Sequence, residues 1–80
     1  MKGKTLVTAE SCTGGGIGAA ITTVSGSSAV YKGGIISYQN EIKHDLLGVS
    51  ESDLEILGPV SAPVAEQMAN GARKALQSDV

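Results

Sequence analysis

Apolar residues divide the first half of the chain into a strand, a helix and a second strand. Residues 4–9 (KTLVTA) are β-branched and apolar at their centre, which predicts a short strand. Beyond a glycine-rich stretch, apolar residues recur with helical spacing between residues 17 and 24. Residues 30–38 predict a second strand. It is interrupted by Gly33 and Gly34, where a ligand or another backbone can approach closely.

The second half of the chain is predicted to be helical. Asn40 can cap a short helix over residues 41–47. Ser50 caps a further turn, which residues 58–59 (GP) stop. The last helix has Ser61 as its cap and one apolar face, with polar side chains opposite. That apolar face comprises Val64, Ala65, Met68, Ala72, Ala75 and Leu76.

These elements predict an α/β fold with two parallel strands in one sheet and three to four helical segments. Both strands are apolar enough to be covered on two faces, as in a parallel sheet. A strand–helix–strand connection also favours parallel neighbours. Because a two-stranded sheet leaves two open edges, residues 1–80 are interpreted as one partial domain, which is either half of a domain or completes itself through a partner. We expect a homo-oligomer.

Composition and charge argue against several classes of function. The 80-residue chain has a formal net charge of −2 and lacks Trp and Phe. It therefore lacks the basic and stacking surfaces of a nucleic-acid binder, and no nucleic-acid partner is expected. The single cysteine cannot form an internal disulfide, and no apolar run reaches the length of a membrane span. We expect a cytoplasmic protein with no membrane partner.

The polar, glycine-rich residues 10–16 (ESCTGGG) lie between the first strand and the following helix. Such a turn presents backbone N–H groups and the positive end of a helix to an anion, usually a phosphate. The spacing fits neither the P-loop nor the dinucleotide fingerprint, and the P-loop lysine is missing. The alternative is a structural turn in which Ser11 or Thr13 caps the helix.

Cys12 and His44 are the residues from which a thiol–imidazole pair could be built. A helix N-terminus favours a thiolate, but nothing in the spacing pairs His44 with Cys12. We therefore interpret Cys12 as a small buried filler and His44 as a solvent-facing residue. A Cys–His enzyme is rejected.

Tyr38 and Lys43 lie close together after the second predicted strand. Active-site groups of α/β sheets often sit where Tyr38 lies, if the carboxyl end of the strand faces a crevice. Lys43 would lie in the first turn of the next helix, where the helix dipole opposes the ammonium charge. A partly desolvated lysine there can act as a general base toward a serine hydroxyl. The residues alone favour the alternatives, a solvated surface lysine and a strand-end core tyrosine.

Together these segments resemble the CinA C-terminal domain family. The family pattern reads TAESCTGG, then GSSA, then YSNExK, then LLGV, then GxVS before a helix. This chain has the corresponding segments in the same order and spacing, with departures at Gln39, Ile42 and Pro59, none of them a presumed catalytic position. The segments are residues 8–15 (TAESCTGG), 26–29 (GSSA), 38–43 (YQNEIK), 46–49 (LLGV) and 58–61 (GPVS).

The resemblance implies an α/β/α layered fold and a small-molecule substrate. It implies hydrolysis of the carboxamide of nicotinamide mononucleotide to nicotinate mononucleotide and ammonia, by a serine–lysine mechanism without metal or cofactor. Lys43 would be the base, and Tyr38 would assist proton transfer or orient the serine. Ser28 and Ser11 compete as the nucleophile, with Ser28 preferred. The residues implied to hold the substrate are Glu10, Thr13, Gly14, Gly15 and Ser27.

Length is the largest departure from the family. Family domains run to about twice this chain, nearer the ordinary domain size. The chain keeps the expected serine, tyrosine and lysine but lacks part of the sheet and one wall of the pocket. Two alternatives to a hydrolase remain: a truncated, non-catalytic remnant that folds by self-association, and a small phosphate- or nucleotide-binding module. We expect weak hydrolysis or none from this chain alone.

Overall fold

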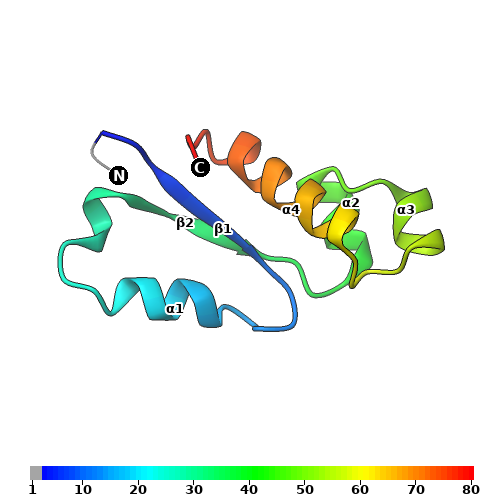
Figure 1. Ribbon diagram of the computed structural model, residues 1–80, viewed down its shortest axis with the longest axis horizontal. Coiled ribbons are helices and arrows are strands. Elements are labelled where there is room, and N and C mark those ends of the chain that lie inside the picture. Colours follow the sequence, from blue (N-terminus) through cyan, green and yellow to red (C-terminus); the bar gives the residue numbers. More distant parts are fainter. Residues whose placement is uncertain (1–2) are drawn as a thin grey trace.

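The computed structural model describes residues 3–80 as a two-stranded sheet with helices on both faces (Figure 1). This confirms the predicted α/β class, with two strands and four α-helices among the described residues. None of these helices is long and apolar enough to cross a membrane. The order along the chain is β1 (Leu6–Glu10), α1 (Gly16–Thr22), a 3₁₀ turn η1 (Ser27–Ala29), β2 (Tyr31–Ile36), α2 (Asn40–Leu47), α3 (Glu51–Ile56) and α4 (Ala62–Ala75).

The two strands pair in parallel, as the sequence predicts. The register runs from Val7 opposite Gly33 to Glu10 opposite Ile36. Because successive side chains of a strand point to opposite faces, β1 serves two different layers. Val7 packs into the core on the α4 side, whereas Thr8 and Glu10 lie on the α1 side. Figure 1 shows α1 and α4 on opposite sides of the sheet.

Both strands are shorter than predicted, for local reasons. β1 begins at Leu6, because the N–H of Thr5 instead donates to Asp79 Oδ2 at 2.9 Å. β2 ends at Ile36, and the N–H of Ser37 makes one further bond to the carbonyl of Glu10 at 2.7 Å. Beyond that bond β1 offers no further partner, so the chain leaves the sheet.

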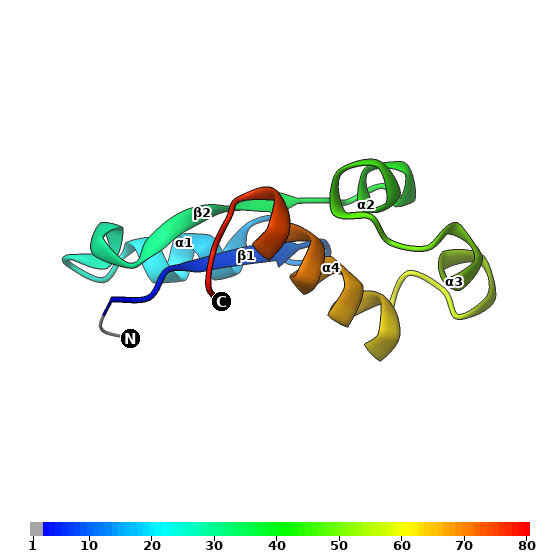
Figure 2. The same cartoon turned by 90° about the horizontal axis from the view of Figure 1, so that it is seen from above.

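The hydrophobic core lies between the sheet and the last three helices. Figure 2, which views the molecule from above, shows α4 crossing the sheet beside β1, with α2 and α3 further along. On α4 the predicted apolar face is buried at three positions, whereas Ala65 and Ala75 are exposed. In contrast, α1 buries no residue at all. The core side chains are Val7, Leu47, Val49, Leu54, Val64, Met68 and Ala72.

The helix caps match the predictions in part. Ser50 caps α3, and its hydroxyl accepts a backbone N–H at 3.3 Å. Asn40 is the first residue of α2 and not its cap; that position belongs to Gln39, which makes no side-chain cap. Ser61 occupies the cap position of α4, but its hydroxyl donates to the carbonyl of Gly58 at 3.2 Å.

The C-terminal residues extend the sheet along the other edge of β1. The N–H of Val80 donates to the carbonyl of Thr5 at 3.0 Å, and its carbonyl accepts the N–H of Val7 at 2.8 Å. One residue bonded to two positions on a neighbouring strand is the pattern of a parallel pair. Val80 therefore lies across β1 from β2, and β1 is the central segment.

Gly71 allows α4 to pack directly against the end of α2. A Cβ at Gly71 would overlap the carbonyl group of Leu47. We predict that Gly71→Ala destabilises the fold by up to about 2 kcal/mol, because overpacking against backbone costs about 1–3 kcal/mol and alanine regains about 1 kcal/mol of helix propensity. Urea denaturation measures the change. Asn70→Ala, at the exposed neighbour, is the control and should stay within about 0.5 kcal/mol of the parent.

Candidate functional site

The predicted site residues lie at two ends of the sheet. Ser27 and Ser28 belong to η1, which immediately precedes β2, whereas Tyr38 and Lys43 follow β2. A strand of six residues spans roughly 20 Å, so β2 separates the two groups. Within one chain the structure does not bring Ser28 to Lys43. Ser11 directly follows β1, and because the strands are parallel it lies at the same end of the sheet as Lys43, which follows β2.

Lys43 is buried, which corrects the expectation of a solvated surface lysine. Its residue surface is only 2% exposed, and it is among the largest fully buried side chains of the described residues. The Nζ atom donates a hydrogen bond to the backbone carbonyl of Tyr38 at 3.1 Å. In residues 3–80 no carboxylate lies within ion-pair distance of it. The amine is thus held by one neutral acceptor.

Tyr38 is exposed, which corrects the expectation of a strand-end core residue. Its surface is 74% exposed, and its contact with Lys43 uses the backbone carbonyl and not the hydroxyl. The preceding residue, Ser37, is fully buried, and its hydroxyl donates to the carbonyl of Glu10 at 3.3 Å. The sequence pattern missed Ser37 because it treated this position as one more residue of the second strand.

The side chain of Glu10 is the best-connected polar group at this end of the sheet. Oε1 accepts the N–H of Ile17 at 2.7 Å and the hydroxyl of Thr13 at 2.8 Å. Oε2 accepts the N–H of Gly18 at 3.0 Å and the hydroxyl of Thr8 at 3.4 Å. Glu10 is only 4% exposed. Its carboxylate therefore occupies the start of α1.

This arrangement differs from both interpretations of the glycine-rich turn. Neither Ser11 nor Thr13 caps α1; the cap position is Gly15, which has a φ of 102° and no side chain to contribute. Gly14 also has a positive φ, of 61°, so the turn uses two residues that adopt this conformation at low cost. The N–H groups of Ile17 and Gly18 at the start of α1, where an anion could bind, are bonded to Glu10. The predicted substrate contacts of this turn stay predictions.

The hydrogen bonds to Glu10 also govern its ionisation. Burial opposes its charge and is the largest single influence, but the bonds from Thr13, Gly18, Ile17 and Thr8 together outweigh it. They hold the pKa of Glu10 below its ordinary value of 4.5. Asp79, which accepts two bonds from Thr5, likewise has a lowered pKa. Both carboxylates therefore favour the folded state when ionised.

An apolar hollow of about 470 Å³ opens beside Ser11 and the start of α4. Cys12 is exposed at its rim, which corrects the expectation of a buried filler. Helix α1, which connects β1 to β2, lies over one face of the sheet. Helices α2 to α4, which connect β2 back to the Val80 edge of β1, lie over the other face. Ligands of open α/β sheets bind at such switch points. The hollow is lined by Ser11, Cys12, Pro59, Val60, Ser61, Ala62, Ala65 and Met68.

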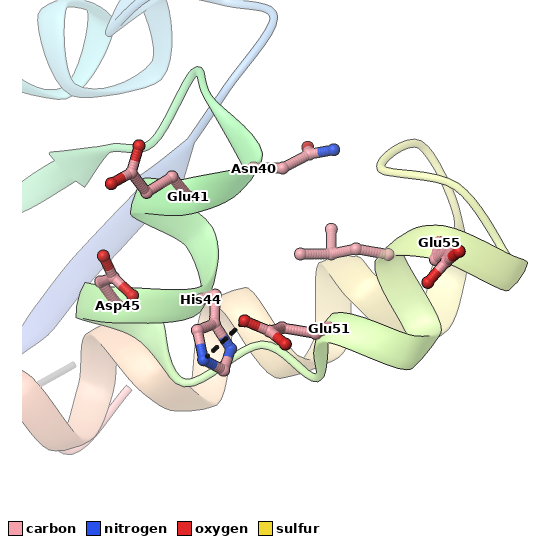
Figure 3. Close-up of a pocket in the computed structure, with 7 residues that line it drawn as sticks. Asn40, Glu41, His44, Asp45, Glu51 and Glu55 are labelled. Carbon is pink, nitrogen blue, oxygen red and sulfur yellow. Dashed lines mark ion pairs between the residues drawn. The ribbon is translucent and has the colours of Figure 1, made fainter.

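A second hollow, of about 400 Å³, lies between α2 and α3 and is lined mainly by acidic side chains (Figure 3). Within it His44 donates from Nδ1 to the carbonyl of Val49 at 2.7 Å, and its Nε2 lies 3.4 Å from Glu51 Oε1. His44 is thus half-buried and joins two helices, away from Cys12. No cluster suited to a metal ion is found among the described residues.

The lowered pKa of Glu10 predicts a specific acid sensitivity. Its contribution to the free energy of unfolding is fully present above the ordinary pKa of 4.5 and is lost as the pH falls toward the folded value. We therefore expect Glu10→Gln to be less stable at neutral pH and to lose less further stability below pH 4.5. Urea titrations at several pH values measure both effects. Glu66→Gln, on the exposed side of α4, should keep the parent's full acid slope; equal slopes in all three proteins would contradict the assignment.

The chain is similar throughout to proteins of one family. Residues 1–80 match the family described as CinA C-terminal domain. A CinA-like protein of Acaryochloris marina (strain MBIC 11017) is 61% identical over 77 residues, which cover 96% of this chain and 18% of that protein. A CinA-like protein of Picosynechococcus sp. (strain ATCC 27264 / PCC 7002 / PR-6) is 59% identical over 76 residues, covering 95% and 18%.

Solved structures share the same arrangement of elements. The competence/damage inducible protein CihA from Agrobacterium tumefaciens superposes with a TM-score of 0.92 at 45% identity, covering 96% of this chain and 47% of that one. A competence-damaged protein (CinA) superfamily protein from Escherichia coli gives 0.91 at 36% identity, covering 95% and 44%. This chain thus spans less than half of either solved chain. With the motifs, the fold and these similarities in agreement, the chain belongs to the CinA C-terminal domain family.

Proposed function

We propose that this chain supplies the serine and lysine of an amidohydrolase site that deamidates nicotinamide mononucleotide. The products are nicotinate mononucleotide and ammonia. The observation that carries the proposal is the buried Lys43, held by a single neutral acceptor at the carboxyl end of the sheet. Family membership supports the same chemistry, because the matched motifs contain the serine, tyrosine and lysine that the resemblance associates with it.

The environment of Lys43 differs from that of an ordinary lysine. Lysines are almost never fully buried unless they are paired with an opposite charge. Burial of an amine without a carboxylate costs free energy, and proteins accept such a cost where the group does chemistry. The Tyr38 carbonyl accepts one of the three hydrogen bonds that the Nζ atom can donate, and a reacting hydroxyl would have to occupy another of these positions.

Ser11 is the better-placed nucleophile within one chain. It lies directly after β1 and lines the apolar hollow at the switch point. Ser28, preferred on the resemblance, lies at the other end of β2, so it could reach Lys43 only from a second copy. The geometry therefore shifts our preference from Ser28 to Ser11. The apolar lining of the hollow suits the flat pyridine ring of the substrate.

The proposed reaction has two steps, formation and then hydrolysis of an acyl-serine ester. The Ser11 hydroxyl oxygen attacks the carboxamide carbon while the Lys43 amine takes the hydroxyl proton. The C–N bond then breaks, Lys43 returns the proton to the leaving nitrogen, and ammonia departs from an acyl-serine ester. Lys43 next takes a proton from water, the water oxygen attacks the ester carbon, and the proton returns to the Ser11 oxygen as nicotinate mononucleotide is released.

We predict that Lys43→Met abolishes ammonia release from nicotinamide mononucleotide while leaving stability near the parent's or above it. Methionine matches the volume of the buried stem and removes an amine whose desolvation is costly. The parent is expected to be slow, so the assay runs at high protein concentration with urea denaturation on the same samples. Lys74→Met, at an exposed position of α4, is the matched control and should keep the parent rate.

The serine variants complete this assay. Ser11→Ala should lose activity together with Lys43→Met, whereas Ser28→Ala should retain it. Loss of activity in Ser28→Ala but not in Ser11→Ala would identify Ser28 of a second copy of the chain as the nucleophile. Ammonia release in the parent no faster than in Lys43→Met would exclude hydrolysis by this chain alone.

A non-catalytic, self-associating protein is the second candidate, favoured by large apolar side chains on the surface. Val60 is 90% exposed and Ile56 is 79% exposed, and Ile36 stands half-exposed on the sheet. Apolar surface of this kind marks interaction sites. An unpaired strand edge adds backbone groups that a second copy can bind.

Self-association predicts concentration-dependent melting. Because a dimer is stabilised by mass action, the melting temperature should rise with protein concentration, and the sedimenting mass should exceed that of one chain. Val60→Ser should reduce both effects if this surface is the interface. A melting temperature independent of concentration, with a monomer in sedimentation, would exclude this candidate.

A further inference from the structure

Glu10 is placed to control the turn from which Ser11 projects. Its backbone carbonyl ends the sheet, where it accepts the N–H of Ser37 at 2.7 Å. Its carboxylate reaches forward across the turn to the N–H groups of Ile17 and Gly18 at 2.7 and 3.0 Å. Ser11 follows Glu10 directly, so one residue fixes the chain on both sides of the proposed nucleophile.

The turn has few other restraints. Its own backbone bonds are the N–H of Gly14 to the carbonyl of Ser11 at 3.0 Å and the N–H of Gly16 to the carbonyl of Thr13 at 3.1 Å. The following helix has seven residues and buries none of them. A helix this short is marginal by itself, and its glycines weaken it further. Charge-assisted bonds to Glu10 are therefore the strongest attachment of this layer.

The hydroxyls of Thr8 and Tyr31 support the carboxylate of Glu10. The hydroxyl of Thr8 lies 2.7 Å from the hydroxyl of Tyr31 and 3.4 Å from Glu10 Oε2. The two glycines beside this group leave it room. A Cβ at Gly18 would lie 2.7 Å from the Tyr31 hydroxyl, and one at Gly34 would overlap the Thr8 hydroxyl. The Thr8 and Tyr31 hydroxyls, together with the lack of a Cβ at Gly18 and Gly34, thus favour one position of the carboxylate.

We propose that Glu10 is the positioning residue of Ser11. Its ionised carboxylate does not contact substrate; it holds the turn so that the serine hydroxyl faces the hollow. The role in hydrolysis rests on the proposed function, whereas the control of the turn can be tested without it. Loss of the carboxylate should release the turn and α1 and leave the core between the sheet and α4 intact.

Hydrogen exchange followed by NMR tests the control of the turn. In Glu10→Gln the amide side chain keeps one acceptor oxygen but places an NH₂ group where Oε2 accepted two bonds. We expect exchange at Ile17 and Gly18 to accelerate about tenfold, the effect of losing a hydrogen bond to a charged group. Exchange at Met68 and Ala72, whose N–H groups lie in the interior of α4, should accelerate by no more than the loss of global stability measured in urea. Glu66→Gln, an exposed carboxylate on α4, is the matched control and should change none of these amides.

Rescue separates the charge of Glu10 from its bulk. In Glu10→Ala the missing heavy atoms, Cγ, Cδ and the two oxygens, are those of acetate, so added acetate should restore most of the protection at Ile17 and Gly18. Acetamide, which has the same size and no charge, should not. Protection that is unchanged in both variants would overturn the proposal, and so would a loss that spreads equally to α4 or a rescue by acetamide.

The assay of ammonia release then connects the turn to catalysis. Glu10→Gln should lower kcat with little change in KM, because Ser11 is misplaced while the binding surface remains. If the parent shows no hydrolysis at all, hydrolysis by this chain alone is excluded, and the exchange and rescue measurements still decide the role of Glu10. A kcat equal to the parent's, in a variant with a released turn, would refute the positioning of Ser11.

Discussion

The carboxyl end of the sheet depends on the interactions of one residue, Glu10. Through its carbonyl it makes the last backbone bond between the two strands, and through its carboxylate it holds the first turn of α1. A buried carboxylate is costly unless its oxygens are bonded, and here each oxygen accepts two donors. The lowered pKa of Glu10 expresses the same balance in favour of the charged form.

The two faces of the sheet are held by different forces. On one face α4 packs with apolar side chains from α2, α3 and β1, and Gly71 lets backbone meet backbone. On the other face α1 buries nothing and is attached through polar groups. Segments with few buried contacts open at lower free energy than a packed core. The serine turn therefore belongs to the more easily opened layer, and the lysine belongs to the rigid one.

This division has a consequence for the proposed chemistry. Lys43 is fixed by the packing of α2 and by the Tyr38 carbonyl, so it provides a stable reference point for a reaction. Ser11 is fixed by hydrogen bonds that depend on ionisation. In a dyad built across these two layers, Ser11 must be positioned as accurately as Lys43, because small displacements at a reacting centre reduce the rate steeply.

Local patterns in the sequence determined the elements and their pairing. Strand, helix and strand, the cap at Ser50 and the buried stripe of α4 follow from interactions between near neighbours, which periodicity and turn residues report. The parallel pairing follows from the strand–helix–strand order. The family also followed from the sequence, because several motifs retain their order and spacing. Only the tertiary structure decided which polar groups are buried. Lys43 reads as a surface residue and Cys12 as a filler, yet the packing of α2 buries the first and the open hollow exposes the second. The partners of Glu10 and the separation of Ser28 from Lys43 were likewise set by contacts between segments, and a one-dimensional pattern carries no distance between them.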